Sequence, residues 1–351
     1  MKVKIVYLLS FLSVMGFMIS CDTTPEALSI QEGNPYTYDE QYYQDLRDYK
    51  ASDHQLCFVW FSDYAKNTSM SNRFAGLPDS IDILSLWGSI PSMDKNPLAY
   101  TEFRHMQKVK GTKMVIPTII RIEHAGAYRD YEFYQMFQDS YVSPVTQEKL
   151  DMRNKALEMY ADHLLKDMWD NDLDGLDLDY EPEGDRLSGA NMSYFVKYLG
   201  GIIGPQSPNP DKLLIIDFYS NYPPQDTEPY ANYFVRQAYT QGFTEHSASR
   251  LQGYIDQPNV ASRWIPPHKF IVTENIGDWW QNGGSPFTEA DGNTLNSRGE
   301  RLYSLEGMAR WNPTQGKKAG FGAFFVQRDY SSNPPYKHLR NGIQAQNPAV
   351  K

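Results

Sequence analysis

Acidic and apolar residues alternate between positions 174 and 181, in the order Asp-Gly-Leu-Asp-Leu-Asp-Tyr-Glu. Successive side chains of an extended strand point to opposite faces, so Asp177, Asp179 and Glu181 would share one face. The Cα atoms of residues two apart on that face lie about 6–7 Å from each other. Like charges this close repel, and a strand that only had to fold would avoid them. Acid and base chemistry on a bound substrate is therefore the leading interpretation.

The same stretch permits two other interpretations. Asp170, Asp172, Asp174, Gly175 and Glu181 match the calcium-binding loop of an EF-hand, and a predicted helix precedes them. Two features count against calcium. Pro-Glu-Gly-Asp at 182–185 occupies the place where the exiting helix should begin, and the sequence has no second loop of this kind. The third interpretation is an acidic turn that leads into a buried strand.

Short apolar runs alternate with stretches of helical spacing along the rest of the chain. The predicted strands are 55–61, 81–87, 113–122, 173–181, 213–219, 250–255, 269–275 and 320–327. The predicted helices are 147–170, 190–203, 229–241, 297–311 and 337–344. This order predicts an α/β protein whose single catalytic domain is a (β/α)8 TIM barrel. An open doubly wound sheet is the alternative, but the Gly-rich loop that usually follows its first strand is missing after Phe61.

Two long connections, 123–146 and 276–294, follow the third and seventh predicted strands. Barrel active sites are built at the carboxyl ends of the strands, so we expect these connections to wall a substrate groove. Glu181 also falls at the carboxyl end of its strand, which places the acidic motif at the same face.

The first 20 residues are typical of an export signal, with Lys2 and Lys4 ahead of an apolar segment too short to span a bilayer comfortably. The segment ends in Met18-Ile19-Ser20-Cys21, which resembles a bacterial lipobox, so we expect a lipid on Cys21 and a location in the cell envelope. An ordinary cleaved signal peptide is the alternative. Residues 21–45 are predicted to be a tether, and 46–351 the catalytic domain.

Composition excludes some functions. The 351 residues are 41% hydrophobic, enough for a substantial core. The net charge is −10, and the absence of any Lys/Arg-rich block argues against binding nucleic acid. The 25 Tyr and 7 Trp suit either ordinary packing or stacking on sugars. We expect a monomer that uses neither a cofactor nor a metal.

The pattern D-G-x-D-x-D-x-E at 174–181 resembles the signature of glycoside hydrolase family 18. That family comprises chitinases and endo-β-N-acetylglucosaminidases on a (β/α)8 barrel, with the motif on strand four, where it also falls here. The resemblance implies substrate-assisted hydrolysis with retention of configuration. Glu181 would then be the acid and base, Asp179 would orient the acetamido group of the sugar, and Asp177 would share a proton with Asp179.

The resemblance also implies a tyrosine on strand six that binds the acetamido oxygen. Gln252 and Tyr254 lie on the predicted sixth strand in a Gln-x-Tyr pattern that resembles bacterial endo-β-N-acetylglucosaminidases. Further substrate contacts are expected near the carboxyl ends of other strands, at Asn221, Tyr222, Trp279, Trp280 and Phe325.

These features favour an endo-β-N-acetylglucosaminidase that cuts the chitobiose core of N-linked glycans, with glycoproteins as its substrates. A hydrolase of chitin or chitooligosaccharides is the second hypothesis. The third is a glycan-binding protein on an inactive scaffold of the same family, although such relatives typically lose the acid that Glu181 supplies here.

Overall fold

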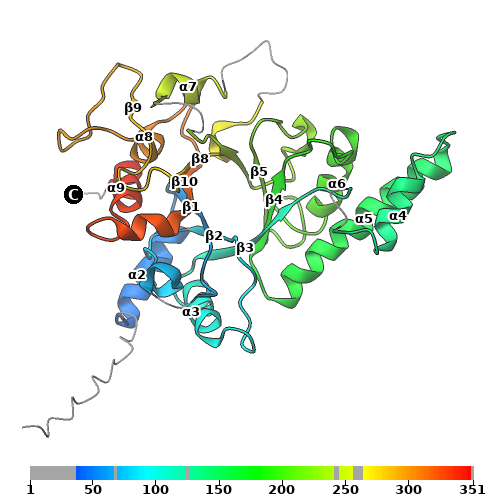
Figure 1. Cartoon of the computed structure of the whole chain (residues 1–351), viewed down its shortest axis with the longest axis horizontal. Coiled ribbons are helices and arrows are strands. Elements are labelled where there is room, and N and C mark those ends of the chain that lie inside the picture. The colour runs from blue at the N-terminus through cyan, green and yellow to red at the C-terminus, as the bar shows by residue number, and fades with distance from the viewer. Residues whose placement is uncertain (1–36, 67–68, 124–126, 241–244, 256–263, 349–351) are drawn as a thin grey trace, which may run out of the picture. The chain divides into compact units, whose positions relative to one another are not determined.

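Eight parallel strands close into a barrel in the computed structural model, which describes residues 37–66, 69–123, 127–240, 245–255 and 264–348 (Figure 1). The strand order around the barrel is β1-β10-β8-β6-β5-β4-β3-β2, which confirms the predicted fold class. The barrel strands are β1 (Leu56–Phe61), β2 (Ile83–Leu86), β3 (Lys113–Ile119), β4 (Gly175–Tyr180), β5 (Leu213–Phe218), β6 (Tyr233–Gln237), β8 (Phe270–Asn275) and β10 (Gly320–Phe324).

Helices cover the barrel and follow most of its strands. They are α2 (Glu40–Ala51), α3 (Pro97–Lys108), α4 (Glu132–Asp139), α5 (Gln147–Asp170), α6 (Ala190–Gly200), α7 (Ala248–Gln252), α8 (Ser304–Arg310) and α9 (Lys337–Gln346). Short 3₁₀ turns lie at Met70–Asn72, Phe74–Gly76, Gln225–Thr227, Pro267–Lys269 and Val326–Ser331. Helix α5 has the bounds that its spacing predicts, and Thr146 caps it by accepting from the Lys149 amide. No helix in the described ranges is long and apolar enough to cross a membrane.

The core has two layers, and β4 contributes to both. Leu176 and Leu178 pack outward into the layer between strands and helices. Inside the barrel, a second cluster gathers apolar side chains from six strands, Phe58, Trp60, Ile83, Val115, Ile215, Val235 and Ile271. Because side chains alternate along β4, Asp177 and Asp179 point toward this interior, as the period of two predicted.

The prediction for the sixth strand is wrong. Residues 229–241 were expected to be helical, but Tyr233–Gln237 form β6 between β5 and β8. Tyr233 and Val235 pack inside the barrel and Phe234 outside, which is strand periodicity. Most of the predicted strand 250–255 belongs to helix α7 and the turn after it, and Ser247 caps that helix by accepting from the Arg250 amide.

The domain begins before the predicted boundary at residue 46. Asp39 caps α2 by accepting from the Tyr42 amide, and Tyr43 is buried. The compact unit accordingly extends from Asp39, so the end of the predicted tether lies inside α2. The signal segment and Cys21 lie outside the described residues.

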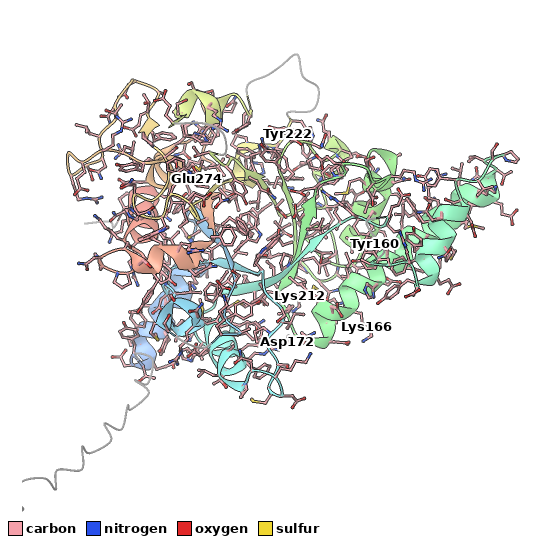
Figure 2. The ribbon with its side chains drawn as sticks, viewed as in Figure 1. Tyr160, Lys166, Asp172, Lys212, Tyr222 and Glu274 are labelled. Atoms are coloured by element: carbon pink, nitrogen blue, oxygen red, sulfur yellow. The ribbon has the colours of Figure 1, made fainter. Side chains whose placement is uncertain are left out.

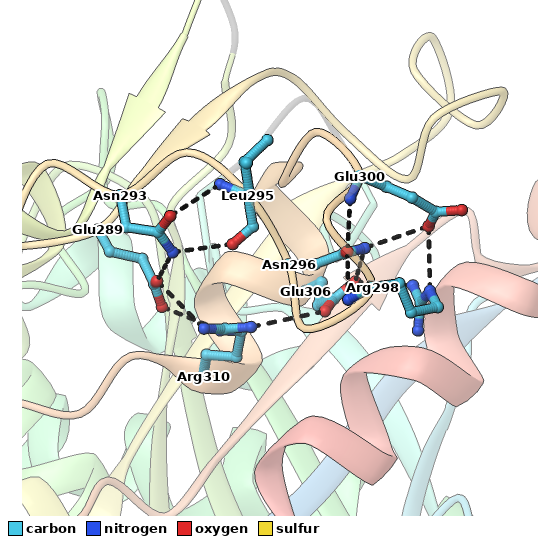
Figure 3. A network of polar contacts seen from close by, with 8 residues as sticks. All are labelled: Glu289, Asn293, Leu295, Asn296, Arg298, Glu300, Glu306 and Arg310. Carbon is cyan, nitrogen blue, oxygen red and sulfur yellow. Dashed lines mark hydrogen bonds and ion pairs between the residues drawn. The ribbon is translucent and has the colours of Figure 1, made fainter.

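The two long connections carry secondary structure of their own, and their part in a substrate groove stays a prediction. Helix α4, within 123–146, packs against α5 on the outside of the barrel (Figure 1). Strand β9 (Phe287–Thr288), within 276–294, pairs with β7 (His246–Ser247). Figure 3 shows how this region is held on α8, where Arg310 forms ion pairs with Glu289 and Glu306.

Candidate active site

A cavity of about 290 Å³ opens at the carboxyl ends of the barrel strands. Carboxyl groups and aromatic rings form its walls, and they come from seven different strands or the residues just after them. The lining residues are Trp60, Trp87, Ile119, Asp179, Glu181, Asp217, Tyr219, Gln237, Tyr239 and Phe324. Asp179 and Glu181 of the predicted motif therefore meet in one cavity, with Asp177 beneath them.

Asp177 is fully buried inside the barrel. Its Oδ2 accepts from the Trp60 indole Nε1 at 2.9 Å and from the Ser85 hydroxyl at 2.7 Å. Its carboxyl also interacts with that of Asp217 on the neighbouring strand β5. Burial raises the pKa of Asp177 to about 6, although these hydrogen bonds lower it.

Asp179 is the next inward side chain and is 3% exposed. Burial raises its pKa to about 8, and the negative charges of Glu181 and Asp177 add to the effect. Its Oδ1 accepts only a long hydrogen bond, 3.3 Å, from the Gln237 amide. Both effects favour the protonated form of Asp179 in the free protein, whereas a positive charge on a bound substrate favours its carboxylate.

Glu181 lies at the mouth of the cavity, with its side chain 33% exposed. Arg121 holds it twice, donating from Nη2 to the Glu181 carboxylate at 2.9 Å and from Nε to the Glu181 backbone carbonyl at 2.5 Å. The same guanidinium lies 3.7 Å from Glu183, whose other oxygen accepts from Asn221 at 2.6 Å. Glu181 is thus held in place on the solvent side of two buried acids.

The sequence analysis missed eight of the ten lining residues, and three of these lie close to Asp179, namely Asp217, Gln237 and Tyr239. Gln237 donates to Asp217 at 2.6 Å and to Asp179 at 3.3 Å. Tyr239 stacks on Phe324, with ring centroids 6.0 Å apart, and burial followed by the charges of Asp217 and Asp179 raises its pKa. Residues 237–239 read Gln-Ala-Tyr, so the Gln-x-Tyr signal was present on the true sixth strand.

Gln252 and Tyr254 are not where the prediction put them. Gln252 lies in α7 and bonds to Thr314, outside the cavity. The Tyr254 ring lies under the Arg236 guanidinium, 4.5 Å from ring centroid to Cζ, and its backbone carbonyl accepts from Tyr222. Neither residue lines the cavity, because the segment that carries them is a helix and turn instead of a barrel strand.

Phe324, one residue before the predicted Phe325, lines the cavity. Strand β10 ends at Phe324, and Phe325 turns into the left-handed region at φ +57°, so its side chain leaves the barrel alternation. The Phe325 ring instead packs beside Phe324, with centroids 4.1 Å apart.

The other predicted contacts lie outside this cavity. Asn221 bonds to Glu183 at the rim, and Tyr222 bonds to Tyr254. Trp279 is 39% exposed on the turn after β8, and Trp280 beside it is partly buried. Their contacts with a substrate stay predictions.

The residues of the EF-hand pattern do not surround one point. Asp170 pairs with Lys166 on α5, and Asp172 pairs with Lys108. Glu181 lies beyond the other end of β4, about 20 Å away along an extended strand. Across the described ranges, no group of three or more His, Cys, Asp or Glu is placed to hold a metal ion.

Carboxyl groups in different environments at the carboxyl end of a parallel barrel are typical of one class of protein, enzymes that use acids and bases. Comparison with known proteins gives the particular family. The model described as glycoside hydrolase family 18, BT1044-like, matches residues 20–345, and the chain belongs to that family.

Individual relatives agree with this assignment. Endo-β-N-acetylglucosaminidase F2 of Elizabethkingia meningoseptica is 25% identical over 366 residues, covering 95% of this chain and 96% of its own. A solved structure of BT1044 with a Glu-to-Gln substitution has a TM-score of 0.67 at 22% identity, covering 88% of this chain and 93% of that one. The endo-β-N-acetylglucosaminidase of Cordyceps militaris, solved with fucosyl-N-acetylglucosamine-Asn, has a TM-score of 0.58 at 19% identity, covering 90% and 98%. The two structures share the fold of this chain.

Proposed function

We propose that this glycoside hydrolase is an endo-β-N-acetylglucosaminidase that cleaves the β-1,4 bond of the N,N'-diacetylchitobiose core of N-linked glycans. The observation that carries the proposal is that the acids of the cavity differ in their exposure to solvent. Glu181 alone among the lining carboxyls is substantially exposed, whereas Asp179 and Asp217 are 3% and 1% exposed. This arrangement favours one acid/base and a nucleophile supplied by the substrate. The relative from Elizabethkingia meningoseptica supports the substrate class.

In the proposed reaction the acetamido oxygen of the substrate attacks its own anomeric carbon while Glu181 protonates the departing glycosidic oxygen. Asp179 accepts a hydrogen bond from the acetamido N–H and stabilises the positive oxazolinium ring. Tyr239 donates to the acetamido oxygen from the other side of the cavity. Water then opens the ring as Glu181 takes its proton, so the configuration is retained.

The test uses two substrates and a matched pair of variants. Wild-type protein, Glu181→Gln and Glu183→Gln are incubated with ribonuclease B and with chitopentaose. We expect wild type to release whole glycans, Glu181→Gln to lose at least about 1,000-fold in kcat, and Glu183→Gln to keep most activity. Chitobiose production without glycan release would instead favour the chitooligosaccharide hydrolase, and glycan binding without hydrolysis would favour the inactive scaffold.

We also propose that a lipid on Cys21 anchors the protein in the cell envelope. The lipobox-like residues 18–21 support this proposal. Expression of wild type and Cys21→Ser in a bacterial host, followed by membrane fractionation and mass spectrometry of the N-terminus, tests it. We expect a diacylated wild type in membranes and a soluble variant. An unmodified wild type in the soluble fraction would contradict the anchor.

A further inference from the structure

Asp217 is the least expected residue of the cavity, since it interrupts the apolar run Leu-Leu-Ile-Ile-Asp-Phe of β5. It lies directly beside Asp179 in the parallel register of β4 and β5. Its side chain is 1% exposed, so solvent contributes little to its solvation. A third buried acid beside two others costs free energy unless its proton and hydrogen bonds are arranged to suit it.

The hydrogen bonds reveal where a proton must lie. Asp177 and Asp217 lie close enough to shift each other's pKa, and two ionised carboxylates so placed have no hydrogen to share. The Oδ1 atoms of both residues are buried and accept from no donor among the described residues. A single proton between the two carboxyls satisfies both acids, and without it two buried negative charges would repel each other.

The donors around the pair decide which carboxyl carries that proton. Asp177 accepts from both Trp60 and Ser85, and these bonds stabilise its negative charge. Within the described ranges, Asp217 accepts from Gln237 alone, and it faces Asp177, Asp179 and the phenol of Tyr239. Burial and the two neighbouring aspartates hold the pKa of Asp217 well above its usual range, in agreement with these contacts.

We propose that Asp217 is a positioning residue that holds the proton shared with Asp177, so that Asp179 is free to face Glu181 and the substrate from the outset. Sharing between Asp177 and Asp179, as the family resemblance implied, is then unnecessary in this chain. Gln237 connects the two functions, because its amide donates to both Asp217 and Asp179. The consequence for catalysis rests on the proposed function, whereas the location of the proton does not.

The test compares Asp217→Asn with Asp217→Ala. An asparagine amide can still donate to Asp177 and accept from Gln237, so it imitates a protonated acid, whereas alanine leaves both partners unpaired. We expect Asp217→Asn to lose about fivefold in kcat/KM and Asp217→Ala about 100-fold, with KM little changed. Equal losses in the two variants, or full activity in Asp217→Ala, would overturn the proposal.

Infrared difference spectra provide a readout that does not depend on activity. At about pH 9 Asp179 is ionised, because its pKa is about 8, so a protonated-carboxyl C=O band lost between wild type and Asp217→Asn belongs to Asp217. We expect that band, and its absence would overturn the proposal even if Asp217→Ala failed to fold. If the band is present but wild type cleaves no glycan, the proposed function fails and the assignment of the proton stands.

Discussion

Aspartates lie toward both ends of β4, but they differ in how many hydrogen-bond donors surround them. Asp174, just before the strand, accepts from the Gln107 amide at 2.8 Å and from the Met114 backbone amide at 2.9 Å. Toward the other end, Asp177 of β4 and Asp217 of the neighbouring β5 each have a buried Oδ1 atom that accepts from no donor among the described residues. Figure 2 marks the two sides of the molecule, with Asp172 and Lys212 toward the lower side of the view and Tyr222 toward the upper side.

The amino end of β2 agrees with Asp174. Asp82 accepts from the Cys57 backbone amide at 2.8 Å and contacts His54 at 3.0 Å, which joins two parts of the fold. At the amino ends of the strands, acids that accept from several donors stabilise the fold. At the carboxyl ends, acids that lack such donors and share protons are available for chemistry. Substitutions at the two faces should therefore separate activity from stability.

The largest effect is expected from Asp179→Asn. We predict a loss of about 100- to 1,000-fold in kcat/KM. A neutral amide carries no negative charge to stabilise a positive oxazolinium ring and its N–H. Steady-state kinetics on a glycoprotein substrate measures the loss. Activity within a few-fold of wild type would remove Asp179 from the proposed mechanism.

The same variant should be more stable than wild type in alkaline solution. The pKa of Asp179 is raised to about 8 in the folded protein, against about 4 when unfolded. The folded state therefore holds a proton that the unfolded state releases, and wild type loses free energy of unfolding as pH rises from about 4 through about 8. Urea unfolding at both ends of this range checks the prediction, since Asp179→Asn removes this loss.

The acids of β4 could be predicted from the sequence, because the motif at 174–181 combines a strand period with neighbouring acids that folding alone would not favour. The placement of Asp179 and Glu181 at the carboxyl end of β4 follows from that period alone. Asp217 could have been noticed as the one acid within an apolar run. Its partnership with Asp177 could not, because it depends on the register between β4 and β5.

The prediction of strand six was wrong for a different reason. Tyr230, Tyr233, Phe234 and Ala238 recur at helical spacing, and a strand of five residues is too short for its own period to outweigh that pattern. Because the sixth strand was placed at 250–255, the Gln-x-Tyr pattern was assigned to Gln252 and Tyr254 instead of Gln237 and Tyr239. The prediction for Phe325 was wrong because this residue is itself left-handed and ends the alternation just after β10. The sequence does not reveal that conformation.

The two tyrosines provide the next comparison. We predict that Tyr239→Phe lowers kcat by about 10- to 100-fold, because the acetamido oxygen loses a donor inside a buried cavity. Tyr254→Phe should change kcat less than threefold, since the ring of Tyr254 lies against Arg236 outside the cavity. Parallel kinetics on both variants decides the matter, and a larger defect in Tyr254→Phe would restore the original assignment.

At the amino face, Asp174→Ala should act on stability alone. Two accepted hydrogen bonds are lost and two donors are left without that partner, which costs about 1–3 kcal/mol of unfolding free energy. Chemical denaturation measures the cost, and kcat/KM should stay within about twofold of wild type. A large kinetic defect at unchanged stability would break the division between the two faces.

The smallest expected effect is a pH dependence at His54. Its hydrogen bond to Asp82 raises the pKa of His54 above its usual value, despite partial burial. The stabilisation is therefore complete below about pH 6.5 and is lost as pH rises through the raised pKa of the folded protein. We expect the difference in unfolding free energy between wild type and His54→Gln to be larger at about pH 5.5 than at about pH 8.5. A difference that grows with pH would contradict this ion pair.

The central claim is that the acids at the carboxyl face promote attack by the sugar's own acetamido group. Proton NMR of the glycan released during the first minutes of hydrolysis tests it most directly, because mutarotation has not yet erased the configuration of the new reducing end. We predict a β-configured N-acetylglucosamine at that end. An α-configured product would mean direct attack by water and would contradict the account.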